Sequence, residues 1–336
     1  MEASTKFETR IHEGGVPRSP LRGRSWLQGA ALLLGLQLLA VLCLILLAPL
    51  KEWQLQLAIP TDYFEPQLDA ADEFEQVRGP LHAFRHGIDR SLVLDAGEAL
   101  AVFDTYNPEH SRRLRAELQH RFPGKPVRWV FYSHHHLDHI QGAAELQPVE
   151  VIAHERVMGY VADWPDAQVL PVTRALKGDA SLQLGAVPVQ LLYLGQSHTD
   201  TLYAFHFPEQ GALFAPDAAF LRSLPPFGLP DYYYPGYLRA LDRLAALEFE
   251  LCIPAHFSRG TKADLLQYRQ LMIDFRQASA ALVADMGGDP SRGAGQRARI
   301  GAAYRSLQQK YGDWHGFDAM FIPHFLGGIG GAYLGF

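Results

Sequence analysis

The segment 133–139 holds four histidines and one aspartate directly after an apolar run that predicts a β-strand. His134 and His136 are two positions apart, so on an extended segment both side chains point to the same side and can chelate one ion together. Asp138 and His139 can then serve a second ion from the other side of the turn. Imidazole and carboxylate groups bind zinc and similar divalent metals. The segment therefore predicts a metal site rather than a solvated polar loop.

Three further candidate ligands, His198, Asp217 and His256, each follow an apolar run that predicts a strand. Any one of them alone would more often be a cap, a turn residue or a core histidine. As a spaced series at successive strand ends they favour one shared site, and together with segment 133–139 they supply enough ligands for two ions.

The hydrophobic pattern predicts strands that alternate with helices. Because the candidate ligands follow strands, the pattern indicates an α/β layered sandwich. The tail 317–336 is rich in glycine and aromatic residues, and its spacing matches no dinucleotide-binding motif and opens no helix. The predicted strands are 91–94, 99–103, 127–132, 149–153, 187–194, 201–207, 212–215 and 251–254, and the predicted helices are 112–121, 237–247, 262–285 and 296–311.

The segment 26–50 is almost entirely apolar and carries no charge. At 25 residues it is long enough to cross a bilayer as a helix. A cleaved signal peptide is the alternative, although its apolar region is usually only about 7–15 residues long. Arg10, Arg18, Arg22 and Arg24 precede the segment, whereas Lys51 alone directly follows it. This excess of positive charge predicts that the N-terminus lies in the cytoplasm and the rest of the chain outside the inner membrane of a bacterium. The expected organisation is a cytoplasmic tail (1–25), a transmembrane anchor (26–50), a linker (51–80), a hydrolase domain (81–260) and a C-terminal helical and Gly/aromatic extension (261–336).

Composition excludes some classes of protein. The net charge of −6 over 336 residues gives no sign of nucleic-acid binding. The two cysteines, Cys43 and Cys252, form no disulfide framework. Nothing in the sequence sets the oligomeric state.

The series His-x-His-x-Asp-His, then His, Asp and His resembles the metallo-β-lactamase-fold superfamily of metallohydrolases over roughly residues 82–260. This resemblance implies an αββα four-layer sandwich with a zinc site for two ions per chain, where iron or manganese could replace zinc. It also implies that Asp104 braces the site. The implied ligands are His134, His136 and His198 for the first ion, Asp138, His139 and His256 for the second, and Asp217 as a bridge between them.

The expected reaction is hydrolysis, because two such ions can share a hydroxide nucleophile, with Asp138 as the catalytic residue that orients it or passes a proton to the leaving group. A bridging aspartate resembles the glyoxalase II-like, lactonase-like and phosphodiesterase-like branches more than true β-lactamases. A site outside the cytoplasm argues against a glutathione thioester, and Phe220 stands where lactonases of this fold carry a tyrosine. An ester, a lactone or a related small molecule is the expected substrate, and the expected membrane anchor together with the Gly/aromatic tail favours a lipophilic one.

The aromatic segment 220–237 follows Asp217 and should wall an apolar substrate pocket, or else pack its own loop onto the domain. His135 is expected to point away from its neighbours, whereas His315 and His324 could reach the pocket from the extension. The alternatives are a phosphodiesterase or β-lactam hydrolase, an iron-dependent oxidoreductase on the same scaffold, and a non-catalytic periplasmic zinc protein.

Overall fold

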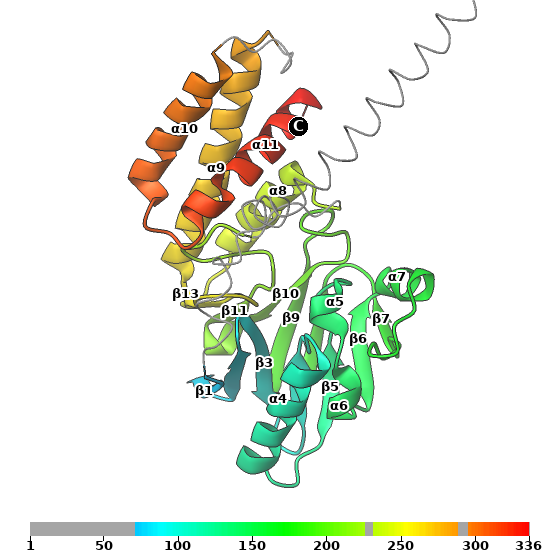
Figure 1. Cartoon of the computed structure of the whole chain (residues 1–336). Helices are drawn as coiled ribbons and strands as arrows, with labels where there is room; N and C mark the ends of the chain where they lie inside the picture. Colours follow the sequence, from blue (N-terminus) through cyan, green and yellow to red (C-terminus); the bar gives the residue numbers. More distant parts are fainter. Residues whose placement is uncertain (1–70, 226–230, 288–294, 336) are drawn as a thin grey trace, which may run out of the picture. The chain divides into compact units, whose positions relative to one another are not determined.

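Two β-sheets form the centre of the protein, which the computed structural model describes over residues 71–225, 231–287 and 295–335 (Figure 1). The strand order in the first sheet is β1-β2-β3-β4-β5-β6-β7, antiparallel from β1 to β4 and parallel from β4 to β7. Its strands are β1 (Glu73–Arg78), β2 (Leu81–His86), β3 (Asp89–Asp95), β4 (Leu100–Phe103), β5 (Val127–Phe131), β6 (Glu150–His154) and β7 (Arg174–Leu176).

The second sheet has the order β13-β12-β11-β10-β9-β8. Strands β11 and β12 pair in parallel, and the other neighbours pair antiparallel. Its strands are β8 (Ala180–Leu184), β9 (Val187–Tyr193), β10 (Tyr203–Phe207), β11 (Ala212–Phe214), β12 (Leu251–Ile253) and β13 (Gly260–Thr261).

Helices cover the outer faces of both sheets. They are α4 (Pro108–Arg121), α5 (Leu137–Ile140), α6 (Ala143–Leu146), α7 (Val157–Asp163), α8 (Tyr234–Ala245), α9 (Lys262–Asp285), α10 (Gln296–Tyr311) and α11 (Phe317–Tyr333). On the first sheet, Leu114 of α4 shares a buried cluster with Val102 of β4. On the second sheet, Leu241 of α8 and Leu265 of α9 share a cluster with Leu213 of β11. The layers therefore run helix, sheet, sheet, helix.

The alternation of side chains along β3 shows why its residues can be apolar on both faces. Leu92 and Leu94 point into the cluster between the sheets, whereas Val93 points into the cluster under α4. Successive residues of a strand face opposite sides, so a strand covered on both sides is apolar throughout. Between the sheets, Phe103 stacks on Phe131 with ring centroids 4.6 Å apart.

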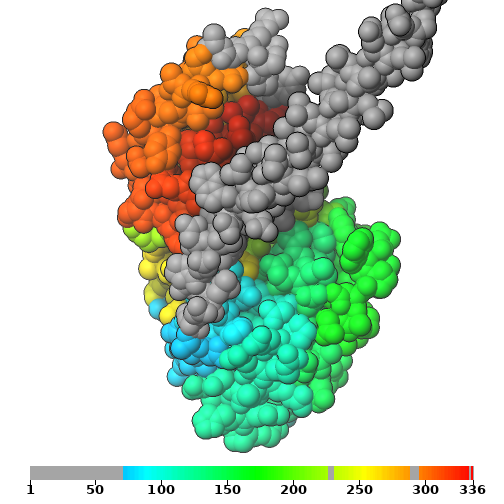
Figure 2. Space-filling view, viewed as in Figure 1, coloured from blue at the N-terminus to red at the C-terminus, as the bar shows by residue number. Residues whose placement is uncertain are grey.

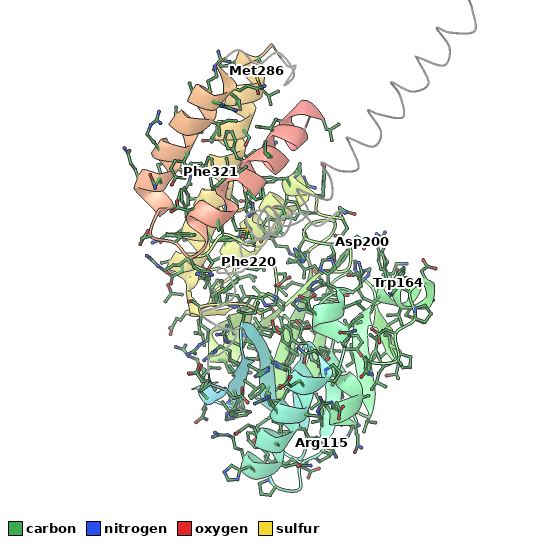
Figure 3. The ribbon with its side chains drawn as sticks, in the orientation of Figure 1. Arg115, Trp164, Asp200, Phe220, Met286 and Phe321 are labelled. Atoms are coloured by element: carbon green, nitrogen blue, oxygen red, sulfur yellow. The ribbon has the colours of Figure 1, made fainter. Side chains whose placement is uncertain are left out.

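The helices after β13, coloured yellow to red in Figure 2, pack on one another and share one apolar cluster with the second sheet. α9 begins with a capping box: the Thr261 hydroxyl accepts from the backbone N–H of Asp264, whose carboxylate accepts from the N–H of Thr261. α11 lies against α9, where Phe321 is 5.6 Å from Phe275 between ring centroids. Phe220 lies where this group of helices adjoins the sheets (Figure 3).

The predicted α/β fold with two sheets and C-terminal helices is confirmed, and the predicted ranges of α9 and α10 match those in the structure. Two predictions were wrong. Residues 73–78 of the expected linker form β1, because edge pairing with β2 holds a segment whose acidic composition suggested a tether. The tail forms α11, because packing on α9 compensates for the low helix propensity of its glycines.

Within the described residues, no helix is both long enough and apolar enough to cross a membrane. The predicted anchor 26–50 lies outside those residues, as does most of the predicted linker.

Candidate metal centre

The end of β5 and the short helix α5 place four of the predicted ligands. Asp104, which follows β4, holds this segment: its carboxylate accepts from the backbone N–H and the hydroxyl of Ser133, each at 2.8 Å. Its Oδ2 also lies 2.9 Å from His139 Nδ1, which donates to it. His139 Nε2 therefore faces the centre, and the predicted bracing role of Asp104 fits these contacts.

The first group of candidate ligands is His134, His136, His198 and Asp217. His136 Nδ1 lies 3.0 Å from His134 Nε2 and 3.1 Å from His198 Nε2. Asp217 Oδ2 lies 3.1 Å from His198 Nε2. His198 comes from the loop after β9 and Asp217 from the end of β11, so the second sheet completes a set that the first sheet begins.

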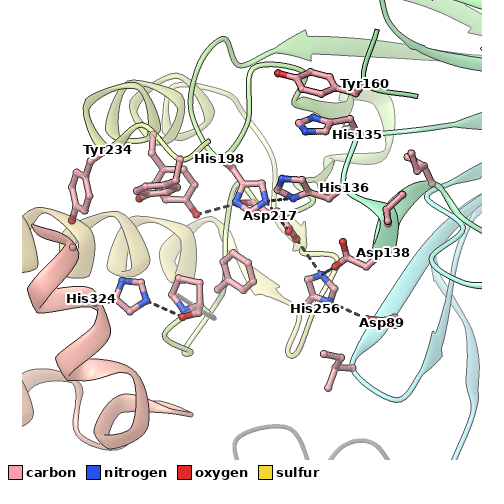
Figure 4. A pocket seen from close by; sticks show the side chains of 18 of the residues that line it. Asp89, His135, His136, Asp138, Tyr160, His198, Asp217, Tyr234, His256 and His324 are labelled. Atoms are coloured by element: carbon pink, nitrogen blue, oxygen red, sulfur yellow. Dashed lines mark hydrogen bonds and ion pairs between the residues drawn. The ribbon is translucent and has the colours of Figure 1, made fainter. Parts of the chain in front are cut away.

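The second group is Asp138, His139 and His256. His139 Nε2 and His256 Nε2 are 3.3 Å apart, and Asp138 Oδ2 lies 3.6 Å from the first and 3.8 Å from the second. Asp217 contacts this group as well: its Oδ2 is 3.4 Å from His139 Nε2, and its Oδ1 is 3.3 Å from His256 Nε2. Asp217 thus lies between the two groups (Figure 4).

These separations fit divalent metal ions. Two ligand atoms that each lie 2.0–2.1 Å from one tetrahedral zinc ion are about 3.3 Å apart. The atoms of each group lie within 4.8 Å of one another, and Asp217 Oδ1 is buried with no hydrogen-bond partner among the described residues. The two groups could therefore hold metal, and they contain every ligand that the sequence predicted.

The electrostatics of the centre depend on one buried carboxylate among several imidazoles. Burial acts to raise the pKa of Asp217, but His139, His256 and His198 lower it well below its usual range. Burial acts to lower the pKa of His256, but Asp217 and Asp89 raise it to about 10. Since a positive charge is favoured beside Asp217, the centre is suited to cations.

The backbone is strained at two of the carboxylates. Asp104 has a φ of 60° and Asp217 a φ of 48°, in the left-handed region that non-glycine residues rarely adopt. Such strain persists where the surrounding structure fixes it, and it is frequent at functional sites.

Sequence reasoning missed two carboxylates that hold ligand imidazoles. Asp89 Oδ1 lies 3.1 Å from His256 Nδ1, and Asp231 Oδ2 lies 3.2 Å from His136 Nε2. The one signal for Asp231 is that no other charged residue occurs between Arg222 and Arg239.

The prediction that His135 points away was wrong, because its ring lines the same cavity as the ligands. It stacks on Tyr160 with ring centroids 3.7 Å apart, and its Nδ1 lies 3.0 Å from Thr201 Oγ1. His324 also lines the cavity, and its Nε2 donates to the Pro225 carbonyl oxygen at 2.8 Å. His315 instead packs against Phe257.

A cavity of about 1110 Å³ opens from the candidate metal centre toward α11. Residues of the predicted aromatic segment line it and also pack the domain: Phe220, Tyr232, Tyr234 and Tyr237 are on its wall, whereas Leu221 and Leu224 are in the core. The described residues of this segment therefore do both things that were predicted as alternatives: they wall a pocket, and they pack the loop onto the domain.

Known proteins share this architecture. The family model "Metallo-beta-lactamase superfamily" matches residues 87–256. The alpha subunit of a 2,4-dinitroanisole O-demethylase from Nocardioides sp. (strain JS1661) is 29% identical over 234 residues, which cover 68% of each chain. A hydroxyacylglutathione hydrolase from Legionella pneumophila (strain Lens) is 30% identical over 102 residues, 28% of this chain and 34% of that protein.

Among solved structures, a metallo-beta-lactamase from Pontibacter korlensis superposes with a TM-score of 0.53 at 17% identity, covering 60% of this chain and 99% of its own. The sec-alkylsulfatase Pisa1 from Pseudomonas sp. gives a TM-score of 0.56 at 16% identity, covering 67% of this chain and 46% of its own. These likenesses show the fold, and the family model covers half of the sequence. The chain belongs to the metallo-beta-lactamase superfamily.

Proposed function

We propose that this protein is a hydrolase that uses two divalent metal ions, preferentially zinc. His134, His136 and His198 would hold one ion, and Asp138, His139 and His256 the other. The observation that carries the proposal is the position of Asp217, whose two carboxylate oxygens lie 3.1–3.4 Å from imidazole nitrogens of both groups. A purely structural zinc site has no need of a shared carboxylate.

Metal ions bound there would lower the pKa of water and polarise the substrate carbonyl group. The chain itself supplies the positioning. Asp138, with 61% of its side chain exposed toward the cavity, can accept a proton and return it to the leaving group. Asp104 and Asp89 keep the ring nitrogens of His139 and His256 directed at the centre.

An uncharged ester or lactone is the substrate class that fits best. Within the described part of the chain, no lysine or arginine lines the cavity. Phosphodiesters and glutathione thioesters carry anionic groups that basic side chains usually bind. In the reaction, water adds to the carbonyl carbon, the bond from that carbon to the alcohol oxygen breaks, and the alcohol leaves with a proton.

Metal analysis and a substrate panel test this proposal. We expect the full-length protein to contain about two zinc ions per chain and to hydrolyse esters or lactones faster than phosphodiesters or β-lactams. Asp217→Ala should lose metal, and its activity should fall by more than about 100-fold. Replacing a residue that only holds a metal ligand in place already costs about 10–100-fold. His120→Ala, an exposed histidine on α4, is the matched control. A metal-free protein that stays inactive after zinc loading contradicts the proposal.

A second candidate reaction is cleavage of an activated aryl ether. The supporting observation is the similarity, across 68% of both chains, to a protein named as a 2,4-dinitroanisole O-demethylase subunit. Addition of water would give 2,4-dinitrophenol and methanol from 2,4-dinitroanisole. Release of the yellow phenol by the purified chain, at a rate above that of its esterase activity, would favour this reaction over ester hydrolysis.

The membrane location remains part of the proposal, supported by the apolar segment 26–50 and the arginines before it. We propose a single-pass anchor with the hydrolase domain on the periplasmic side. Protease added to intact spheroplasts should digest the domain, and full protection would contradict this orientation.

A further inference from the structure

The cavity beside the candidate metal centre is large and mostly apolar. Its volume of about 1110 Å³ is slightly above the roughly 300–1,000 Å³ of pockets for drug-sized ligands. Apart from the candidate ligands its walls are mainly aliphatic and aromatic, with Ile140, Val161 and Phe220 among them, and α11 also lines it. A small ester would fill only a fraction of this space.

Two glycines of α11, Gly328 and Gly330, differ in their surroundings. Gly328 is required by packing, because an added Cβ would collide with Ser279 of α9. Gly330 also lies on the cavity wall, but an added Cβ there would meet no atom of the described residues within 4 Å. Since glycine costs a helix about 0.8–1.0 kcal/mol relative to alanine, packing does not explain Gly330.

The aromatic ring of Tyr232 also lines the cavity. Tyr232 Oη is buried and makes no hydrogen bond to any described residue. Because this hydroxyl is buried rather than open to the cavity, Tyr232 adds to the apolar character of the wall.

We propose that the substrate is an uncharged ester or lactone with a long apolar group, that this group lies in the cavity along α11, and that Gly330 sets the length accepted. Water adds to the carbonyl carbon and the carbon–oxygen bond to the alcohol breaks, as above. This inference rests on the proposed hydrolase function and adds to it the chemistry of the substrate and the residue that limits its size.

A chain-length series tests the inference on the full-length, zinc-loaded protein. For p-nitrophenyl acetate, butanoate, octanoate and decanoate, kcat/KM should rise about fourfold with each methylene that enters the cavity. Gly330→Leu should keep acetate hydrolysis within about twofold and lose about tenfold or more on octanoate, and Gly330→Ala should fall between. Gly301→Leu is the matched control, because Gly301 lies on α10 and its added Cβ meets only the end of Arg305.

A binding measurement separates this inference from the proposed function. N-phenyl-1-naphthylamine, an uncharged probe that fluoresces in apolar sites, needs no hydrolysis and should bind wild type more tightly than Gly330→Leu. Because leucine favours a helix over glycine, Gly330→Leu should melt no lower than wild type, which excludes misfolding. Wild-type chain-length preference and probe binding in Gly330→Leu would overturn the inference. If wild type hydrolyses no ester, the proposed function fails. Tighter probe binding to wild type than to Gly330→Leu would then still support binding of an apolar group along α11, and equal binding would contradict it.

Discussion

Two tyrosines on the wall of the cavity differ in what their hydroxyl groups contact. Tyr237 Oη lies 2.8 Å from Tyr268 Oη and donates to the Asp217 carbonyl oxygen at 3.2 Å. Tyr232 Oη has no partner among the described residues. A hydrogen bond contributes about 0.5–1.5 kcal/mol to stability, whereas an unsatisfied buried group costs about 1–3 kcal/mol. The two hydroxyls should therefore affect the free energy of unfolding in opposite directions.

Replacement of each tyrosine by phenylalanine tests this difference. Tyr237→Phe should lower the free energy of unfolding by about 1 kcal/mol, because it removes a satisfied hydroxyl. Tyr232→Phe should leave that free energy unchanged or raise it. Urea denaturation of the two variants measures both effects, and each variant is the control for the other. Equal losses would show that Tyr232 Oη has a stabilising partner.

At the level of elements, a buried carboxylate joins α9 to α10. Asp274 of α9 accepts from Lys310 Nζ and from Tyr311 Oη, each at 2.8 Å, and from Gln270 Nε2 at 2.7 Å. Burial acts to raise the pKa of Asp274, but these three donors lower it below its usual value. Its ionised form is therefore the one that the packing of the two helices favours.

Asp274→Asn should lower the free energy of unfolding at pH 7 by about 1–2 kcal/mol, because hydrogen bonds to a charged group are lost. Since the native pKa is lowered, the wild-type contribution is complete above the unfolded-state pKa of about 3.9 and is lost as pH falls through the native value. Urea denaturation at pH 7 and pH 3 should show the difference narrowing at the lower pH. Asp285→Asn, at the exposed end of α9, should have little effect at either pH.

At the scale of the whole molecule, the candidate metal centre joins the two sheets. The segment 133–139 follows β5 of the first sheet, whereas His198, Asp217 and His256 follow β9, β11 and β12 of the second. Ions held by both sets would bind the folded chain and not the unfolded one, so they would stabilise the sandwich.

Chelation should therefore lower the melting temperature of the zinc-loaded protein. An ion present at 100 times its dissociation constant adds about 2.7 kcal/mol to the free energy of unfolding. Calorimetry with and without EDTA measures the loss, and restored zinc should reverse it. Asp217→Ala should show a smaller shift. An unchanged melting temperature in the wild type would mean that metal does not join the sheets.

Features that depend on local chemistry could be predicted from the sequence. The ligand series was visible because histidines and aspartates follow apolar runs, and α9 and α10 were visible from helical spacing. Asp231 and Asp89 were not predicted as partners of the ligand imidazoles, because their roles depend on contacts with His136 and His256, which are distant in sequence.

The sequence by itself determined the ligand types, the alternation of strands and helices and the family, because these depend on residue identity and short-range periodicity. The tertiary structure alone decided that Asp89 and Asp231 contact ligand imidazoles, that a glycine-rich tail is a helix, and that Gly330 of this helix lines an apolar cavity. The physical reason is that burial and close approach between distant segments arise only when both sheets and the C-terminal helices pack together.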